Sequence, residues 1–96
     1  MSEAALQKKI INYLKTVDKL WFVNVPGNPQ GRGRRGIPDI LICYMGEFIA
    51  IEIKVGVKKP SKLQQYEIDK INNAQGEAFV ARSLNDVIGF IELFDM

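Results

Sequence analysis

The sequence predicts an α/β domain with a central mixed β-sheet, and three observations carry this prediction. Three segments place apolar residues at helical spacing, and four short segments are rich in β-branched or aromatic residues. Their order along the chain is helix, three strands, helix, strand, helix. Because the second helix joins the third strand to the fourth, we expect these two strands to be parallel, with the helix as their crossover.

The N-terminal elements are a helix, a strand and a loop. The helix is predicted over residues 2–18, where Ser2 is a suitable N-cap. Its apolar stripe consists of Leu6, Ile10, Leu14 and Val17. The strand is predicted at 21–25, with Trp21 in the core, and it ends at Pro26-Gly27. Residues 27–36 are rich in glycine, proline and arginine, so we expect a basic loop.

Two further strands, at 40–43 and 48–54, flank a turn at Met45-Gly46, and we expect Cys43 in the core. Residues 55–60 form a second basic loop.

The last three elements begin at a serine cap. Ser61-Lys62-Leu63-Gln64 fits a capping box that opens a helix over 61–75, and Gly76 is expected to stop that helix. A strand at 77–82 follows. Ser83 then caps a final helix that continues to the end of the sequence.

Length and composition restrict the class of protein. The 96 residues suit one domain, covering 1–96, and no apolar run reaches the roughly 20 residues that a membrane span needs. The single cysteine points to a reducing compartment, such as the cytoplasm of a bacterium or of a phage-infected host. Because the chain has no histidine, mechanisms that depend on imidazole are excluded.

Positive charge gathers in the middle of the chain although the net charge is only +2. A solvated surface explains any such cluster about as well as a binding face does. If the cluster binds a polyanion, we expect contacts to phosphates rather than to bases. The candidate residues are Arg32, Arg34, Arg35, Lys58, Lys59 and Lys62.

The hairpin around Met45-Gly46 brings two carboxylates together. With a symmetric turn, residue 43 pairs with 48 and residue 40 with 51, so that Asp39 lies opposite Glu52. Side-chain alternation then places Lys54 on the same face as both carboxylates, and the isoleucines of the two strands on the other face. A slip of one residue would mix the two sets.

Such a carboxylate pair needs a proton or a cation between its members. Oxygen ligands suit Mg²⁺ or Mn²⁺, which complete their coordination with water and phosphate oxygens. The ammonium of Lys54 could orient the attacking water and offset charge on the phosphate. Taken singly, Glu-x-Lys on a strand is usually a solvated edge, and Asp after Pro is a common turn residue. The combination around an apolar hairpin is much rarer.

These motifs resemble the VRR-NUC family of the PD-(D/E)XK, or restriction-endonuclease-like, nuclease superfamily. The matching features are Glu3, Gly36-Ile37-Pro38-Asp39, Glu52-Ile53-Lys54 and Gln64, and the resemblance covers nearly the whole chain. It implies a restriction-endonuclease-like core. The residues Phe79-Val80-Ala81-Arg82-Ser83 depart from the Val-Arg-Arg signature of the family name, so the resemblance assigns no role to Arg82.

The resemblance also implies roles for individual residues. Asp39, Glu52 and the backbone carbonyl of Ile53 would bind the metal, and Lys54 would position the nucleophilic water. Gln64 would orient Lys54 or the metal shell, although its place in the capping box offers a purely structural role. Glu3 would approach the metal directly or through water, or would simply be an acid favoured by the first turn of its helix.

The function expected from these features is that of a Mg²⁺-dependent endonuclease that cuts branched DNA, such as four-way (Holliday) junctions. Cutting a junction calls for paired active sites, and hence a homodimer. The last helix is apolar on more than one face, which a partner chain could cover. The alternatives are an inactive nucleic-acid-binding module that uses the same basic face, and a nuclease for linear DNA ends, flaps or RNA.

Overall fold

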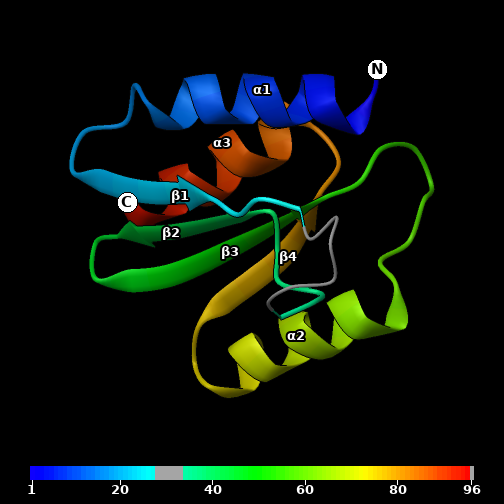
Figure 1. The fold of residues 1–96 in the computed structure, drawn as a ribbon. Coiled ribbons are helices and arrows are strands. Elements are labelled where there is room, and N and C mark those ends of the chain that lie inside the picture. The colour runs from blue at the N-terminus through cyan, green and yellow to red at the C-terminus, as the bar shows by residue number, and fades with distance from the viewer. Residues whose placement is uncertain (28–33, 96) are drawn as a thin grey trace.

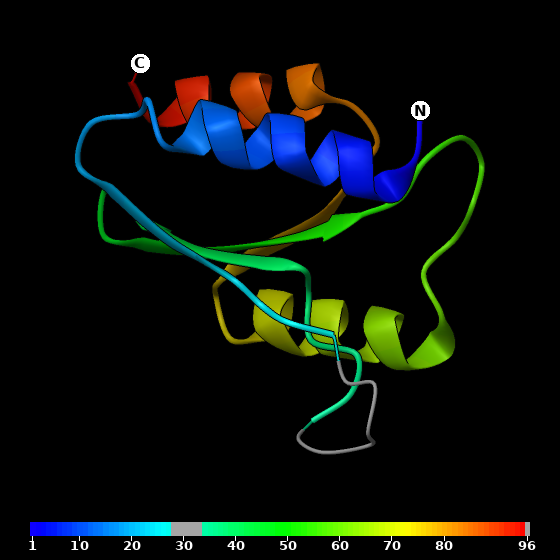
Figure 2. The same ribbon diagram turned by 45° about the horizontal axis from the view of Figure 1, so that its top comes forward.

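The computed structural model describes residues 1–27 and 34–95, and these form three layers (Figure 1). Helices α1 (Glu3–Leu14) and α3 (Leu84–Glu92) cover one face of the sheet, and α2 (Lys62–Asn73) covers the other (Figure 2). A short 3-10 helix, η1 (Leu93–Asp95), follows α3. The predicted order of helices and strands is confirmed.

The sheet has the order β1-β2-β3-β4 within the described residues. Strands β1 (Leu20–Asn24), β2 (Ile40–Tyr44) and β3 (Glu47–Ile53) are antiparallel neighbours. Strand β4 (Glu77–Ala81) runs parallel to β3, as the crossover through α2 requires.

The register of the β2–β3 hairpin is the predicted one, with Cys43 opposite Phe48 and Ile40 opposite Ile51. The turn explains why the pairing is symmetric. Met45 and Gly46 have φ angles of 54° and 78°, the left-handed conformation that a two-residue hairpin turn of type I′ needs at both central positions.

The main core lies between the sheet and helices α1 and α3. The isoleucines of β2 and β3 point to this side and are fully buried, together with the apolar stripe of α1. On α3, Val87 and Ile91 are buried, while Phe90 and Phe94 pack against the same core. The sheet and α1 therefore cover most of the apolar surface of α3, and Leu93, at its C-cap, is the large apolar side chain that remains exposed within the described part of this segment.

The opposite face of the sheet is only partly covered. Ile68 of α2 packs on Ala50 and Ala78, which belong to β3 and β4. Strands β1 and β2 extend beyond this contact, so Trp21 is 61% exposed and Cys43 is also exposed. The prediction that these two residues lie in the core is therefore wrong, because each points to the side that α2 leaves uncovered.

Serine caps begin all three α-helices. The side-chain oxygens of Ser2, Ser61 and Ser83 accept backbone N–H groups of the first turns. The end of α2 differs from the prediction, because Gln75 rather than Gly76 adopts the left-handed conformation, with φ 75°. Gly76 is needed for another reason, since a Cβ there would lie 2.8 Å from Cγ2 of Ile71.

Gly36 determines how the segment before β2 passes the start of α2. Its φ is +82°, and a Cβ at this position would lie 2.8 Å from the carbonyl oxygen of Leu63. Glycine therefore lets residues 36–39 pass directly against the first turn of α2. This contact brings Asp39 and the start of α2 to the same end of the sheet.

No helix within residues 1–27 and 34–95 combines the length and hydropathy required to cross a membrane.

Candidate active site

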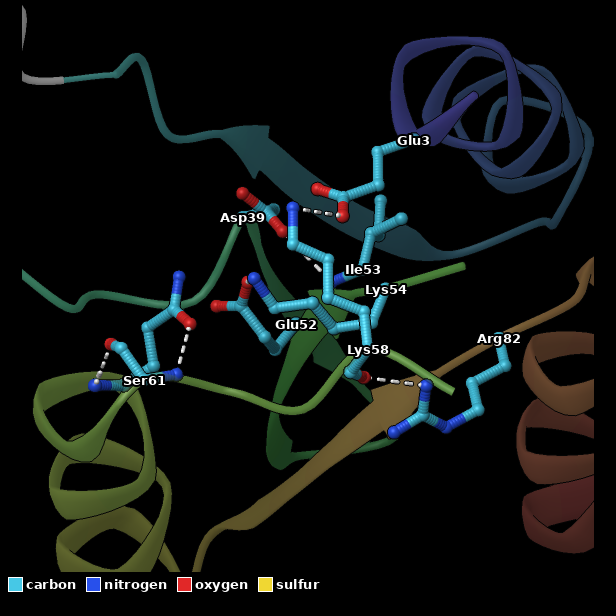
Figure 3. A network of polar contacts seen from close by, with 9 residues as sticks. Glu3, Asp39, Glu52, Ile53, Lys54, Lys58, Ser61 and Arg82 are labelled. Atoms are coloured by element: carbon cyan, nitrogen blue, oxygen red, sulfur yellow. Dashed lines mark hydrogen bonds and ion pairs between the residues drawn. The ribbon is translucent and has the colours of Figure 1, made fainter. Parts of the chain in front are cut away.

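Asp39 and Glu52 meet at the end of the β2–β3 hairpin (Figure 3). The pairing of Ile40 with Ile51, continued by one residue, puts Asp39 opposite Glu52, as predicted. Asp39 is fixed in place because its Oδ2 accepts the backbone N–H of Ile53 at 2.8 Å. The main chain of β3 thus orients one carboxylate toward its neighbour.

Glu52 is a buried acid in an unfavourable electrostatic environment. Its side chain is 2% exposed, and its Oε1 has no hydrogen-bond partner within the described residues. Burial raises the pKa of Glu52 to about 8, and the nearby charge of Asp39 contributes in the same direction. A buried oxygen without a donor, beside a second carboxylate, is the arrangement that a cation would stabilise.

Lys54 lies on the same side as Glu52 and is also buried, at 7% exposure. Its Nζ is 3.8 Å from Oε2 of Glu52, and its positive charge lowers the pKa of that acid. The backbone N–H of Lys54 donates to the carbonyl of Ala81 at 3.2 Å, which ties this residue to the end of β4. A buried lysine beside two carboxylates is poorly explained as a solvated strand edge.

Gln64 makes the predicted capping box. Its Oε1 accepts the backbone N–H of Ser61 at 2.8 Å, and its own N–H donates to Oγ of Ser61 at 3.1 Å. The residue is half-buried and lines a cavity of about 270 Å³ that Asp39 also lines. Capping uses the amide oxygen, so the side-chain NH₂ is the group that Gln64 can offer to this cavity.

Glu3 approaches from the first turn of α1, but its described partner is a lysine. Its Oε2 lies 3.3 Å from Nζ of Lys58, which reaches across from the loop after β3 (Figure 3). The charge of Glu3 also raises the pKa of Glu52, by less than burial and Asp39 do. Across residues 1–27 and 34–95, no three carboxylate, thiol or imidazole side chains come close enough to hold a metal ion. Of the three carboxylates predicted to hold the metal, Asp39 and Glu52 therefore lie together, and Glu3 does not complete a three-carboxylate site with them.

Arg34 forms an ion pair that sequence reasoning missed. Its Nε and Nη2 donate to the two carboxylate oxygens of Glu67, both at 2.7 Å. The side chain of Glu67 is only 6% exposed, whereas that of Arg34 is 66% exposed. An acid inside the apolar stripe of α2 was the available signal, because such a position needs a cationic partner. Arg34 therefore ties the segment before Gly36 to α2.

Two of the basic residues predicted to bind nucleic acid lie close to Asp39. Arg34, Arg35 and Gly36 line the same cavity as Asp39. Arg35, Lys59 and Lys62 are exposed, and the Lys58 side chain is 65% exposed. Arg32, also predicted to contact nucleic acid, lies outside the described residues.

The three-layer fold and the mixed sheet are those of a restriction-endonuclease-like domain. The chain has the fold of a solved "VRR_NUC domain", with 24% identity, a TM-score of 0.76 and 94% of each chain covered. It also resembles a solved "VRR_NUC domain protein" at 21% identity and TM-score 0.76, with 96% of this chain and 86% of the other covered. No curated protein matches the sequence at a significant level.

The model of the archaeal Holliday junction resolvase (Hjc) family matches residues 8–96. The chain therefore belongs to this family of nucleases that act on DNA.

Proposed function

We propose that this protein is a Mg²⁺-dependent endonuclease that cuts branched DNA, and that four-way junctions are its substrate. The observation that carries the proposal is the buried Glu52, whose Oε1 lacks a hydrogen-bond partner within the described residues and whose neighbours are Asp39 and Lys54. Membership of the Holliday junction resolvase family supports the choice of substrate.

The residues of the site fit a divalent cation bound by oxygen ligands. Asp39, Glu52 and the backbone carbonyl of Ile53 would hold Mg²⁺, for which Mn²⁺ is the natural substitute. When bound, the cation would neutralise phosphate charge and make a water molecule more acidic. Asp39 is already oriented by the N–H of Ile53, so this ligand needs little reorganisation.

Lys54 would position the attacking water for in-line displacement at phosphorus. Its main chain is tied to the end of β4 and its ammonium is buried 3.8 Å from Oε2 of Glu52, so it can hold a water in one orientation. The side-chain NH₂ of Gln64 would donate to the same water or to a phosphate oxygen, while its Oε1 remains bonded to Ser61. Glu3 would join the metal shell through water after parting from Lys58.

The basic residues would bind the phosphates on either side of the scissile bond. Arg35, Lys58, Lys59 and Lys62 have exposed side chains suited to this task. Arg34 would contribute its charge while remaining paired with the buried Glu67, because leaving that acid alone would be costly. Arg32 completes the proposed set.

A homodimer is part of the proposal, because a four-way junction is resolved by two symmetric cuts. The surface available for it is the uncovered sheet face rather than α3. Trp21 and Phe48 are 61% and 44% exposed, and both pair with Cys43, so the three side chains form one row across the sheet. An apolar row of this kind is a candidate for burial against a second copy.

We expect Trp21→Lys to convert the dimer into a monomer at micromolar concentration, because it places a charge in the centre of the apolar row. Sedimentation equilibrium measures the change, and Lys15→Glu, at the C-cap of α1 on the opposite side of the sheet, is a control for altered charge. Wild-type protein that sediments as a monomer would contradict the dimer.

The proposed function is tested with a labelled panel of four-way junctions, flaps, splayed arms, linear duplex and single strands. We expect symmetric nicking of the junction in Mg²⁺ and none in the presence of a chelator. If the protein preferred flaps or duplex ends, the proposed substrate would be wrong and the proposed chemistry would stand. Binding without cleavage in Mg²⁺ or Mn²⁺ would instead identify an inactive binding module.

A further inference from the structure

Arg82 makes contacts that no part of the proposed mechanism uses. It follows the end of β4, and its Nη1 donates to the backbone carbonyl of Lys58 at 2.7 Å (Figure 3). The same Nη1 donates to the backbone carbonyl of Gly56 at 2.9 Å. Its own backbone N–H donates to Oδ2 of Asp86, in the first turn of α3. Arg82 thus joins the start of α3 to the loop between β3 and α2.

That loop, residues 54–61, lies between the main parts of the site. It begins at the buried Lys54 and ends at Ser61, the N-cap of α2, whose backbone N–H donates to the side chain of Gln64. Lys58 extends from it to within 3.3 Å of Glu3.

The loop has little internal support. Within the described residues, the main chain of 55–60 makes one further hydrogen bond, from the N–H of Lys58 to the carbonyl of Val55 at 3.3 Å. Residues 56–59 are exposed, so packing contributes little to their position. The two hydrogen bonds from the Arg82 guanidinium therefore hold the loop at the point where Lys58 leaves it.

We propose that Arg82 is a positioning residue for DNA binding, which acts through the main chain of Gly56 and Lys58. By fixing these two carbonyls it keeps the ammonium of Lys58 beside the carboxylate site, where the phosphate nearest the metal would lie. A charged donor that satisfies two carbonyls forms strong, directional hydrogen bonds, which suits it to hold an exposed loop. This inference rests on the proposed function, since it assigns Lys58 to the phosphate backbone.

A double-mutant cycle tests the proposal. The dissociation constant of a four-way junction is measured in Ca²⁺, as a non-cleaving substitute, for wild type, Arg82→Met, Lys58→Met and the double variant. We expect Arg82→Met to weaken binding by about 5–20-fold in the wild-type background, but by less than about twofold when Lys58 is already methionine. Arg82→Lys, which keeps donors and charge, should restore most of the affinity.

Two controls separate positioning from other effects. Lys15→Met removes an equal charge at the far end of α1 and should leave the junction affinity unchanged. The far-UV circular dichroism of Arg82→Met should match that of the wild type, whereas general unfolding would change it. Hydrogen exchange of the Lys58 amide, which donates to the carbonyl of Val55, should rise in Arg82→Met.

The outcomes distinguish this inference from the proposed function. Additive effects of Arg82→Met and Lys58→Met, with wild-type cleavage intact, would show that Arg82 acts independently of Lys58 and would overturn the inference alone. Unchanged affinity of Arg82→Met would do the same. Failure of the wild type to bind or cut any DNA would overturn both.

Discussion

Replacing Lys54 by methionine is expected to slow junction cleavage by about 10²–10⁴-fold while changing DNA affinity by less than about threefold. Methionine keeps most of the buried aliphatic stem, so the packing at the end of β3 is retained. What it removes is the ammonium 3.8 Å from Glu52, the group proposed to position the attacking water. Single-turnover rates with labelled junctions in saturating Mg²⁺ measure the effect.

Asp39→Asn provides the matched comparison, because it should abolish cleavage through a different step. The asparagine oxygen can still accept the N–H of Ile53, so the local structure is kept while the charge is lost. Calorimetric titration should then show Mg²⁺ binding in Lys54→Met and none in Asp39→Asn. Lys15→Met is the control for loss of positive charge. If Lys54→Met cut junctions at the wild-type rate, Lys54 would have no part in the chemical step.

The β2–β3 hairpin shows how far sequence reasoning reaches in this fold. Its register follows from local rules, since a Met-Gly turn with two positive φ angles enforces symmetric pairing. Alternation then separates the buried isoleucines from Glu52 and Lys54. The juxtaposition of Asp39 with Glu52 needed no knowledge of the other elements, and for that reason it could be predicted.

The exposure of Trp21 and Cys43 could not be predicted in the same way. Both have the apolar character of core residues, and their exposure depends on how much of the sheet α2 covers. A crossover helix of 12 residues lies over β3 and β4 and leaves β1 open on that side. The extent of coverage is a property of tertiary packing, which alternation along one strand does not contain.

Hydrogen-bonded pairs between residues of distant segments also could not be predicted from the sequence. Arg34 and Glu67 are 33 positions apart, and Arg82 is 26 positions from Gly56. Each arginine could equally have been a phosphate contact on a basic surface, and only the fold reveals the buried acid or the backbone carbonyls that it meets. The buried stripe of α2 did contain a hint, because Glu67 lies next to the buried Ile68.

Glu52 is expected to make the metal-free protein less stable as the pH rises. Its pKa in the folded state is about 8, above the usual value of 4.5, so the folded state binds a proton more tightly than the unfolded state. The contribution to stability is therefore fully present below about pH 4.5 and is lost as the pH rises through about 8. Above that pH, folding must bury a carboxylate beside Asp39.

Urea unfolding in a chelator at several pH values between these limits measures the effect, with Glu52→Gln as the matched variant. Glutamine keeps the shape and cannot ionise, so at the alkaline end it should be more stable than wild type by on the order of 2–4 kcal/mol. Saturating Mg²⁺ should remove this difference by stabilising only the wild type, and its binding should release a proton below pH 8. Parallel stability profiles for wild type and Glu52→Gln, with no response to Mg²⁺, would mean that Glu52 is neither strained in the fold nor a metal ligand.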